Sequence, residues 1–145
     1  MALNRAYSEQ AERAVLGSML LDSRNVSHCA TILSINDFYV QANRNIFECI
    51  KELYENHEAV DVTSVTNKLQ EKGYLDSVGG VSYLVELSEG VTLSNVSYYI
   101  EIMKDKTNLR VLAEFLENVV ENFDAESQND THKYLNDLEE QILQI

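Results

Sequence analysis

The chain has 145 residues, of which 45% are hydrophobic and 24% charged, and its net charge is −13 at pH 7. This length suits one domain with a core of its own, and this composition excludes an intrinsically disordered chain. Because proline is absent and glycine occurs only five times, most strand and turn signals are missing and we expect an all-α fold.

Several classes of protein are disfavoured by the same composition. No apolar run approaches the roughly 20 residues that cross a bilayer, and no signal peptide is recognisable, so we expect a cytoplasmic protein. Cys29 and Cys49 lie in helical apolar patterns and are expected to be buried thiols. Residues 111–145 are strongly acidic, with Lys133 as their one basic residue. Because no basic cluster is present, we do not expect direct binding to nucleic acid.

The first ninety residues are expected to form a small globular helical bundle of five helices. Ser8 can cap the first helix, in which Ala11, Val15 and Met19 recur every four residues, and its broad apolar stripe indicates a central, buried position. A second short helix is expected over 25–33.

The next three helices follow from clear signals. The stretch 41–56 is strongly amphipathic, with an apolar side made of Ile46, Phe47, Ile50, Leu53 and Tyr54. Asp61 or Thr63 caps the following helix, and Gly73 can end it in the left-handed conformation. Gly79 and Gly80 form a joint before a helix that ends at Gly90 and is expected to bury one face, made of Val81, Leu84, Val85 and Ser88.

After Gly90 the periodicity predicts a long helix over 94–122, a polar loop over 124–130 and a helix over 131–145. Two such stripes joined by a short loop predict an antiparallel helical hairpin, so we divide the chain into a globular part, 1–93, and a C-terminal hairpin, 94–145. The apolar stripe of the long helix begins with Val96, Ile100 and Met103. The polar run 104–108 follows, and there we expect the helix to leave the bundle.

The hairpin is expected to pair with a second hairpin, because alone it would leave a large apolar surface in water. The residues predicted to form this dimer interface are Leu109, Leu112, Leu116, Val119, Phe123, Leu135, Leu138 and Ile142. Its outer face is acidic and is expected to be open to a basic partner, with the candidate residues Glu114, Glu117, Glu121, Asp137 and Glu140.

Signals for catalysis are missing. No glycine begins a GxxxxGK[ST] phosphate loop, and none of His28, His57 and His132 lies in a metal-binding motif. We therefore predict no catalytic, cofactor-binding or metal site in these residues. Tyr83 and the pair Tyr98–Tyr99 are expected in the core or at an interface, because no basic residues interleave them as in a single-strand binding surface.

Several segments in order resemble the N-terminal domain of DnaB-type replicative DNA helicases. They are AERAVLGSMLLD at 11–22, DFY at 37–39, RNIF at 44–47, VDVTSVTNKLQEKGYLDSVGGVSYLVELS at 60–88 and SNVSYYIEIMKDKTNLR at 94–110. The resemblance is specific over residues 9–110 and architectural over 111–145. The acidic hairpin and the proline-free N-terminus depart from the family pattern and favour a phage parent.

The resemblance implies a collar built from six copies, arranged as three hairpin dimers, that docks a primase and in some systems a helicase loader. It also implies a separate motor domain that binds ATP and Mg²⁺, hydrolyses ATP and moves on single-stranded DNA. The chain would then be part of a helicase or a free-standing collar protein. Two alternatives remain open: a phage adaptor that caps or loads a host helicase, and a small DNA-binding regulator.

Overall fold

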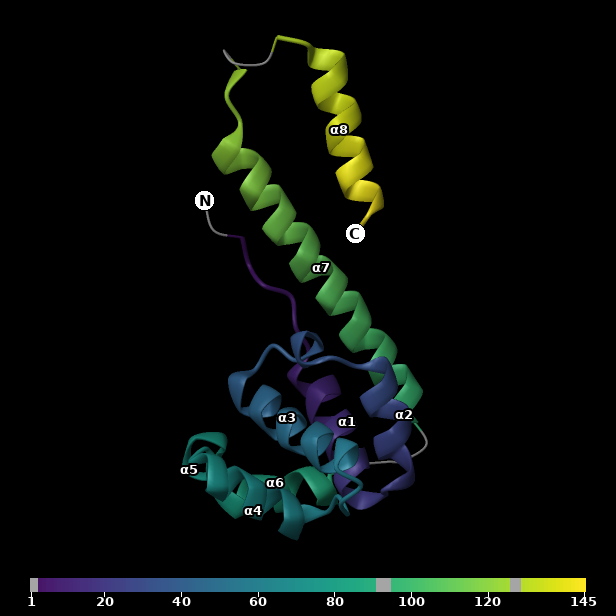
Figure 1. Cartoon of the computed structure of the whole chain (residues 1–145), viewed down its shortest axis with the longest axis vertical. Coiled ribbons are helices and arrows are strands. Elements are labelled where there is room, and N and C mark those ends of the chain that lie inside the picture. Colours follow the sequence, from purple (N-terminus) through teal and green to yellow (C-terminus); the bar gives the residue numbers. More distant parts are fainter. Residues whose placement is uncertain (1–2, 91–94, 126–128) are drawn as a thin grey trace.

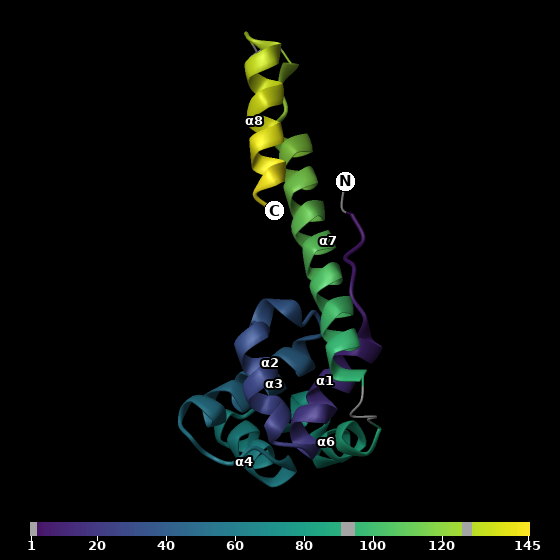
Figure 2. The same cartoon turned by 90° about the vertical axis from the view of Figure 1, so that its right-hand side faces the viewer.

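The computed structural model describes residues 3–90, 95–125 and 129–145. Within these ranges the chain is all-α, without a β-strand, as predicted. A globular helical bundle carries a long helix and a second helix that turns back along it (Figures 1 and 2). The elements are α1 (Glu9–Leu21), α2 (Arg24–Ile32), the short 3₁₀ helix η1 (Ile35–Asp37), α3 (Gln41–Glu55), α4 (Val62–Lys72), α5 (Leu75–Val78), α6 (Gly80–Glu89), α7 (Val96–Asn122) and α8 (Thr131–Leu143).

Helix α1 is the central helix of the globule, as its broad apolar stripe predicts. The hydroxyl of Ser8 accepts a hydrogen bond from the backbone N–H of Ala11 and so caps the helix. Every residue from Val15 to Leu20 is buried. Helices α2, α3, α6 and α7 all pack against α1, which therefore organises the bundle.

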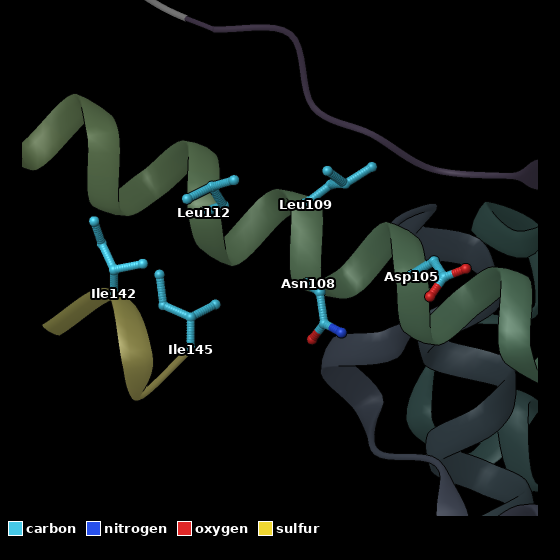
Figure 3. A pocket seen from close by; sticks show the side chains of 6 residues that line it. All are labelled: Asp105, Asn108, Leu109, Leu112, Ile142 and Ile145. Atoms are coloured by element: carbon cyan, nitrogen blue, oxygen red, sulfur yellow. The ribbon is translucent and has the colours of Figure 1, made fainter. Parts of the chain in front are cut away.

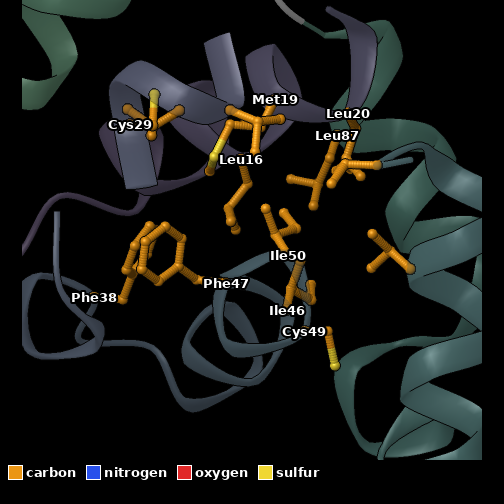
Figure 4. Packing of buried hydrophobic residues seen from close by; sticks show 14 of the residues in the cluster. Leu16, Met19, Leu20, Cys29, Phe38, Ile46, Phe47, Cys49, Ile50 and Leu87 are labelled. Atoms are coloured by element: carbon orange, nitrogen blue, oxygen red, sulfur yellow. The ribbon is translucent and has the colours of Figure 1, made fainter. Parts of the chain in front are cut away.

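Helix α3 contributes one complete face to the core (Figure 4). Four of the five apolar residues that the amphipathic pattern predicts for this face are buried, namely Ile46, Phe47, Ile50 and Leu53, and Cys49 is buried beside them. The ring of Phe47 packs on that of Phe38, with centroids 4.7 Å apart. Tyr54 lies at the edge, where its hydroxyl is 3.1 Å from that of Ser27.

The two cysteines are free, buried thiols, as predicted. Figure 4 shows Cys29 and Cys49 in different parts of the core. Burial raises the pKa of each thiol to about 11, so both stay protonated at neutral pH. They act as small apolar side chains in the core.

A buried carboxylate joins three helices. Glu12 of α1 is 1% exposed, and it accepts hydrogen bonds from the backbone N–H groups of Tyr39 at 2.9 Å and Val40 at 3.3 Å, immediately before α3. The side-chain NH₂ of Asn43 donates to the same carboxylate at 3.0 Å. The Tyr83 hydroxyl of α6 donates to the side-chain Oδ1 of Asn43 at 2.6 Å. These partners satisfy a charge that burial would otherwise make costly.

Local signals set both ends of α4. The Asp61 carboxylate accepts a hydrogen bond from the backbone N–H of Ser64, and the Ser64 hydroxyl is bonded to the Asp61 N–H, so Asp61 and not Thr63 is the cap. Gly73 ends the helix with φ of 76°, in the left-handed region that glycine adopts readily.

The region after Gly73 departs from the prediction in two ways. The short helix α5 precedes α6, so the described globule has six α-helices where five were predicted. Helix α6 buries Leu84 and Leu87, whereas Val81 and Val85 of the predicted face are exposed and Ser88 is half-buried. This short helix carries apolar residues on more than one side, so its sequence pattern is compatible with two buried faces. Packing selects the face with two leucines, because leucine side chains bury more apolar area than valine side chains.

Helix α7 has 27 residues and is therefore about 40 Å long. Only its first part enters the core, through Val96, Ile100 and Met103, and the rest projects from the globule. Helix α8 runs antiparallel to it and has no buried residue. It ends at Leu143, before the predicted end, because the last two residues form a tighter turn. The predicted helix start at Ser94 and part of the predicted loop, 126–128, lie outside the described residues.

Candidate interaction surface of the helical hairpin

A buried carboxylate fixes the base of α7 to the globule. Asp37 is 2% exposed and accepts hydrogen bonds from Lys104 Nζ and Thr107 Oγ1, each at 2.8 Å. Burial alone would raise the pKa of Asp37, but the bonds from Lys104, the Ser34 N–H and Thr107 hold it below its ordinary value. The polar run 104–108 thus lies where α7 leaves the core, as predicted, and Lys104 and Thr107 bind the helix to the globule at that point.

Arg110 extends this contact by one more turn of α7. Its guanidinium donates to the backbone carbonyls of Ala6 and Asn36, each at 2.8 Å. It also lies over the ring of Tyr39, 5.7 Å from the centroid, and the ring of Tyr7 stacks on Tyr39 at 4.6 Å. Because one guanidinium carries five donors in a fixed plane, this side chain links α7 to both η1 and the N-terminal segment.

The N-terminal segment, residues 3–7, runs beside α7 (Figure 1), and we call it the N-terminal strap. Two guanidinium nitrogens of Arg5 donate to the Glu117 carboxylate, at 3.0 and 2.7 Å, and the Leu3 N–H donates to it at 2.7 Å. The bond from Arg5 is the main cause that lowers the pKa of Glu117. Glu117 is one of the predicted partner-binding acids, but it is engaged within the chain, so we remove it from that set.

From Leu109 onwards the apolar side chains of the hairpin stay largely in water. Five of the eight predicted interface residues are exposed, namely Leu109, Leu116, Phe123, Leu135 and Ile142. The other three, Leu112, Val119 and Leu138, are half-buried. The apolar surface is wider than the predicted stripe, because it also includes Val111, Val120, Leu143 and Ile145, of which Val120 is 68% and Leu143 78% exposed.

The two helices of the hairpin face each other across open grooves. The groove nearer the globule is lined by Leu109 and Leu112 of α7 and by Ile142 and Ile145 at the end of the chain (Figure 3). A second groove towards the tip is lined by Val119 and Leu138, among others, and the rings of Phe123 and Tyr134 lie 5.9 Å apart there. Leu116 and Leu135 line neither groove and face solvent.

The four remaining candidate acids, Glu114, Glu121, Asp137 and Glu140, are exposed. They do not share one patch. Glu114 lines a pocket with three arginines at the base of the hairpin, whereas Asp137 lies towards the tip, beside Lys133 and Tyr134. A basic partner would therefore meet negative charge at several separate places along the hairpin.

Other predicted features occupy surface positions. His28, His57 and His132 are exposed, and no group of His, Cys, Asp or Glu within the described ranges is placed to hold a metal ion. Tyr83 and Tyr99 pack against the core, but Tyr98 is exposed, with the edge of its ring against Tyr99. Across the helices that the structure describes, none combines the length and apolar character of a membrane span.

An all-helical bundle that presents a hairpin with a large uncovered apolar surface has the features of an interaction domain. The chain matches the model of the DnaB-like helicase N terminal domain over residues 4–105, and it belongs to this family. The match ends at the base of the hairpin, in line with the resemblance noted in the sequence, which is specific up to residue 110.

Curated relatives of the chain are much longer than it is. It is 41% identical over 106 residues to the replicative DNA helicase DnaB of Geobacillus stearothermophilus, an alignment that covers 72% of this chain and 23% of that protein. It is 30% identical over 140 residues to DnaB of Haemophilus influenzae, covering 96% of this chain and 30% of that protein. The chain thus spans less than a third of the length of either relative.

Solved structures extend the similarity to the hairpin. The N-terminal domain of DnaB helicase from Mycobacterium tuberculosis has a TM-score of 0.83 and 30% identity, covering 98% of this chain and 100% of that one. The N-terminal domain of DnaB helicase from Helicobacter pylori, described together with its interactions with primase, has a TM-score of 0.63 and 22% identity, covering 77% of this chain and 87% of that one. The second likeness is one of fold alone.

Proposed function

We propose that this chain is the assembly and docking domain of a hexameric replicative DNA helicase. The observation that carries the proposal is the uncovered apolar surface of the hairpin, on which Leu116, Leu135 and Leu143 face solvent although the chain has a well-packed core. A second hairpin supplies a matching surface, and a twofold pair of this kind buries the same residues on both copies. Membership of the helicase family supports this assignment.

In this proposal three hairpin dimers form a ring, and the ring contributes no catalytic residue of its own. A separate motor domain would bind ATP and Mg²⁺ and unwind DNA, as the names of the full-length relatives suggest. The domain would act in the cytoplasm of a bacterial or phage-infected cell, where the DNA of such a helicase lies.

Primase is the partner that we propose for docking, with a helicase loader as a second one. The description of the Helicobacter pylori domain with its primase interactions supports primase. The exposed acids of the hairpin, Glu121, Asp137 and Glu140, suit a basic partner surface. Binding between purified primase and this domain should weaken as the salt concentration rises. An affinity that does not change with salt would count against an electrostatic contribution from the acidic residues.

Oligomer mass tests the hairpin interface. The double variant Leu116→Asp and Leu138→Asp places charge on the proposed dimer surface, and light scattering should report a monomer where the wild type is a dimer or larger. A matched control, Val81→Asp with Tyr74→Asp, changes two exposed residues of the globule and should leave the mass unchanged. An unchanged mass of the hairpin variant would rule out this interface.

A further inference from the structure

A pocket of about 310 Å³ at the base of the hairpin gathers positive charge in a chain whose net charge is −13. The N-terminal strap, η1, the start of α3 and the middle of α7 all contribute to it. The residues that matter for its chemistry are Arg5, Asn36, Tyr39, Arg44, Arg110 and Glu114.

Two of the three arginines have no acidic partner. Arg5 is neutralised by Glu117, but within the described ranges no carboxylate lies in ion-pair distance of Arg44 or Arg110. Arg44 donates to the Ile35 carbonyl at 3.4 Å and to Asn36 Oδ1 at 3.0 Å. Arg110 donates only to the two backbone carbonyls described above and to the hydroxyl of Thr107. Each guanidinium therefore keeps N–H donors that no described residue accepts.

The two unpaired charges are near enough to repel each other. Burial lowers the pKa of Arg110, and Arg44 acts in the same direction, although the carboxylates of Glu12 and Asp37 oppose it. An anion bound between the two guanidinium groups would remove this repulsion and replace the water lost on burial.

We propose that this pocket binds the carboxylate groups of an acidic polypeptide segment of a partner protein. A guanidinium group recognises a planar carboxylate through two parallel hydrogen bonds, a geometry that a lysine cannot provide, and the pocket offers two such groups. The proposal is separate from the docking role of the hairpin, because that acidic surface suits a partner of the opposite charge.

Nucleic acid fits the pocket less well. The ring of Tyr39 is already covered by Tyr7 and lies under Arg110, so it offers no free platform on which a base could stack. Two unpaired arginines release few counterions, and the net negative charge of the chain repels a polyphosphate. A short acidic peptide carries fewer negative charges, so the net charge of the chain repels it less, and it can bind where the local potential is positive.

The test uses the full chain and a defined probe, an acetylated hexaglutamate peptide, at low salt. The side-chain Nε–H signals of Arg44 and Arg110 in NMR spectra should shift and saturate on titration. Hexaglutamine, inorganic phosphate at equal charge and a thymidine dodecamer are the comparison ligands, and each should give smaller or no saturable shifts. Equal shifts with phosphate would indicate an unselective anion site, and tighter binding of the dodecamer would indicate a nucleic-acid site; either result overturns the proposal.

Charge-matched variants separate the pocket from the general field. Arg44→Gln should weaken hexaglutamate binding about fivefold, whereas Lys133→Gln, the same change of net charge on α8, should have little effect. Glu114→Gln removes the acid at the rim and should strengthen binding about twofold, and Glu139→Gln on α8 is its control. Arg110 is left in place because it holds the base of α7. Equal effects of Arg44→Gln and Lys133→Gln would show that only net charge matters and would refute a specific site.

Discussion

Glu12 and Asp37 are buried carboxylates, and each connects parts of the chain that are distant in sequence. Glu12 receives its bonds from residues 27 to 31 positions away, and Asp37 receives two of its bonds from residues 67 and 70 positions away. A buried carboxylate destabilises a fold unless its oxygens are hydrogen-bonded, and both of these are. They therefore specify how helices are placed as well as holding them together.

Glu12→Gln should destabilise the globule by about 2 to 4 kcal/mol. The glutamine replaces one acceptor oxygen with an NH₂ group that would face the backbone N–H of either Tyr39 or Val40, because these two groups bind different oxygens of Glu12. Urea denaturation followed by circular dichroism measures the free energy of unfolding. Glu9→Gln, an exposed change in the same turn of α1, should cost less than about 1 kcal/mol. Similar losses for the two variants would show that the buried network contributes little.

Asp37→Asn should destabilise the chain by about 2 to 3 kcal/mol at pH 7, because the charged acceptor for Lys104 is lost. The pKa of Asp37 is lower in the folded state than the ordinary value of 3.8, so its contribution is complete above that value and is lost as the pH falls through the folded pKa. The difference in unfolding free energy between wild type and variant should therefore shrink below about pH 4. A difference that stays constant down to pH 2 would contradict this role.

At the scale of the element, sequence predicted best what depends on neighbouring residues. The Ser8 cap, the amphipathic face of α3 and the glycine that ends α4 all follow from residues within one or two turns. The inner face of α6 was predicted wrongly, because two faces were available and only packing distinguishes them. The local sequence pattern predicts the bounds of a helix more reliably than it predicts which side of that helix is buried.

The interaction surfaces divide in the same way. Periodicity alone predicted the apolar stripe of the hairpin, since steps of three and four place residues on one side of a helix. The arginine pocket has no such signal, because its residues come from four segments and meet only after folding. The Arg5 and Glu117 pair, 112 positions apart, was likewise beyond local reasoning.

Substitutions of Gly73 test whether backbone conformation alone determines which residue can end α4. Its φ is 76°, and an added Cβ would meet nothing within 4 Å. Gly73→Ala should therefore lower stability by about 1 kcal/mol through strain in the left-handed region, while Gly73→Asn should cost less because asparagine tolerates that region. Thermal unfolding of both variants measures the order, and a less stable Asn variant would argue against a conformational cause.

At the scale of the whole molecule, the hairpin is anchored firmly at one end and uncovered along the rest. Asp37, Arg110 and the N-terminal strap hold the base of α7, whereas α8 lies beside α7 and away from the globule (Figure 2). This arrangement holds an apolar surface in a fixed direction from the globule. A fixed direction is what a ring of copies requires, because each interface must recur at the same angle.

Protection of α8 against hydrogen exchange should therefore depend on protein concentration. None of its residues is buried in the single chain, so its amides should exchange rapidly when the protein is dilute and slowly when hairpins pair. Amides of α1 lie in the core and should be protected at every concentration. In the Leu116→Asp and Leu138→Asp variant the dependence should vanish, with α8 rapid throughout. Strong protection of α8 in a dilute monomer would mean that contacts with α7 alone stabilise α8. Pairing of hairpins would then not explain why the leucines are exposed.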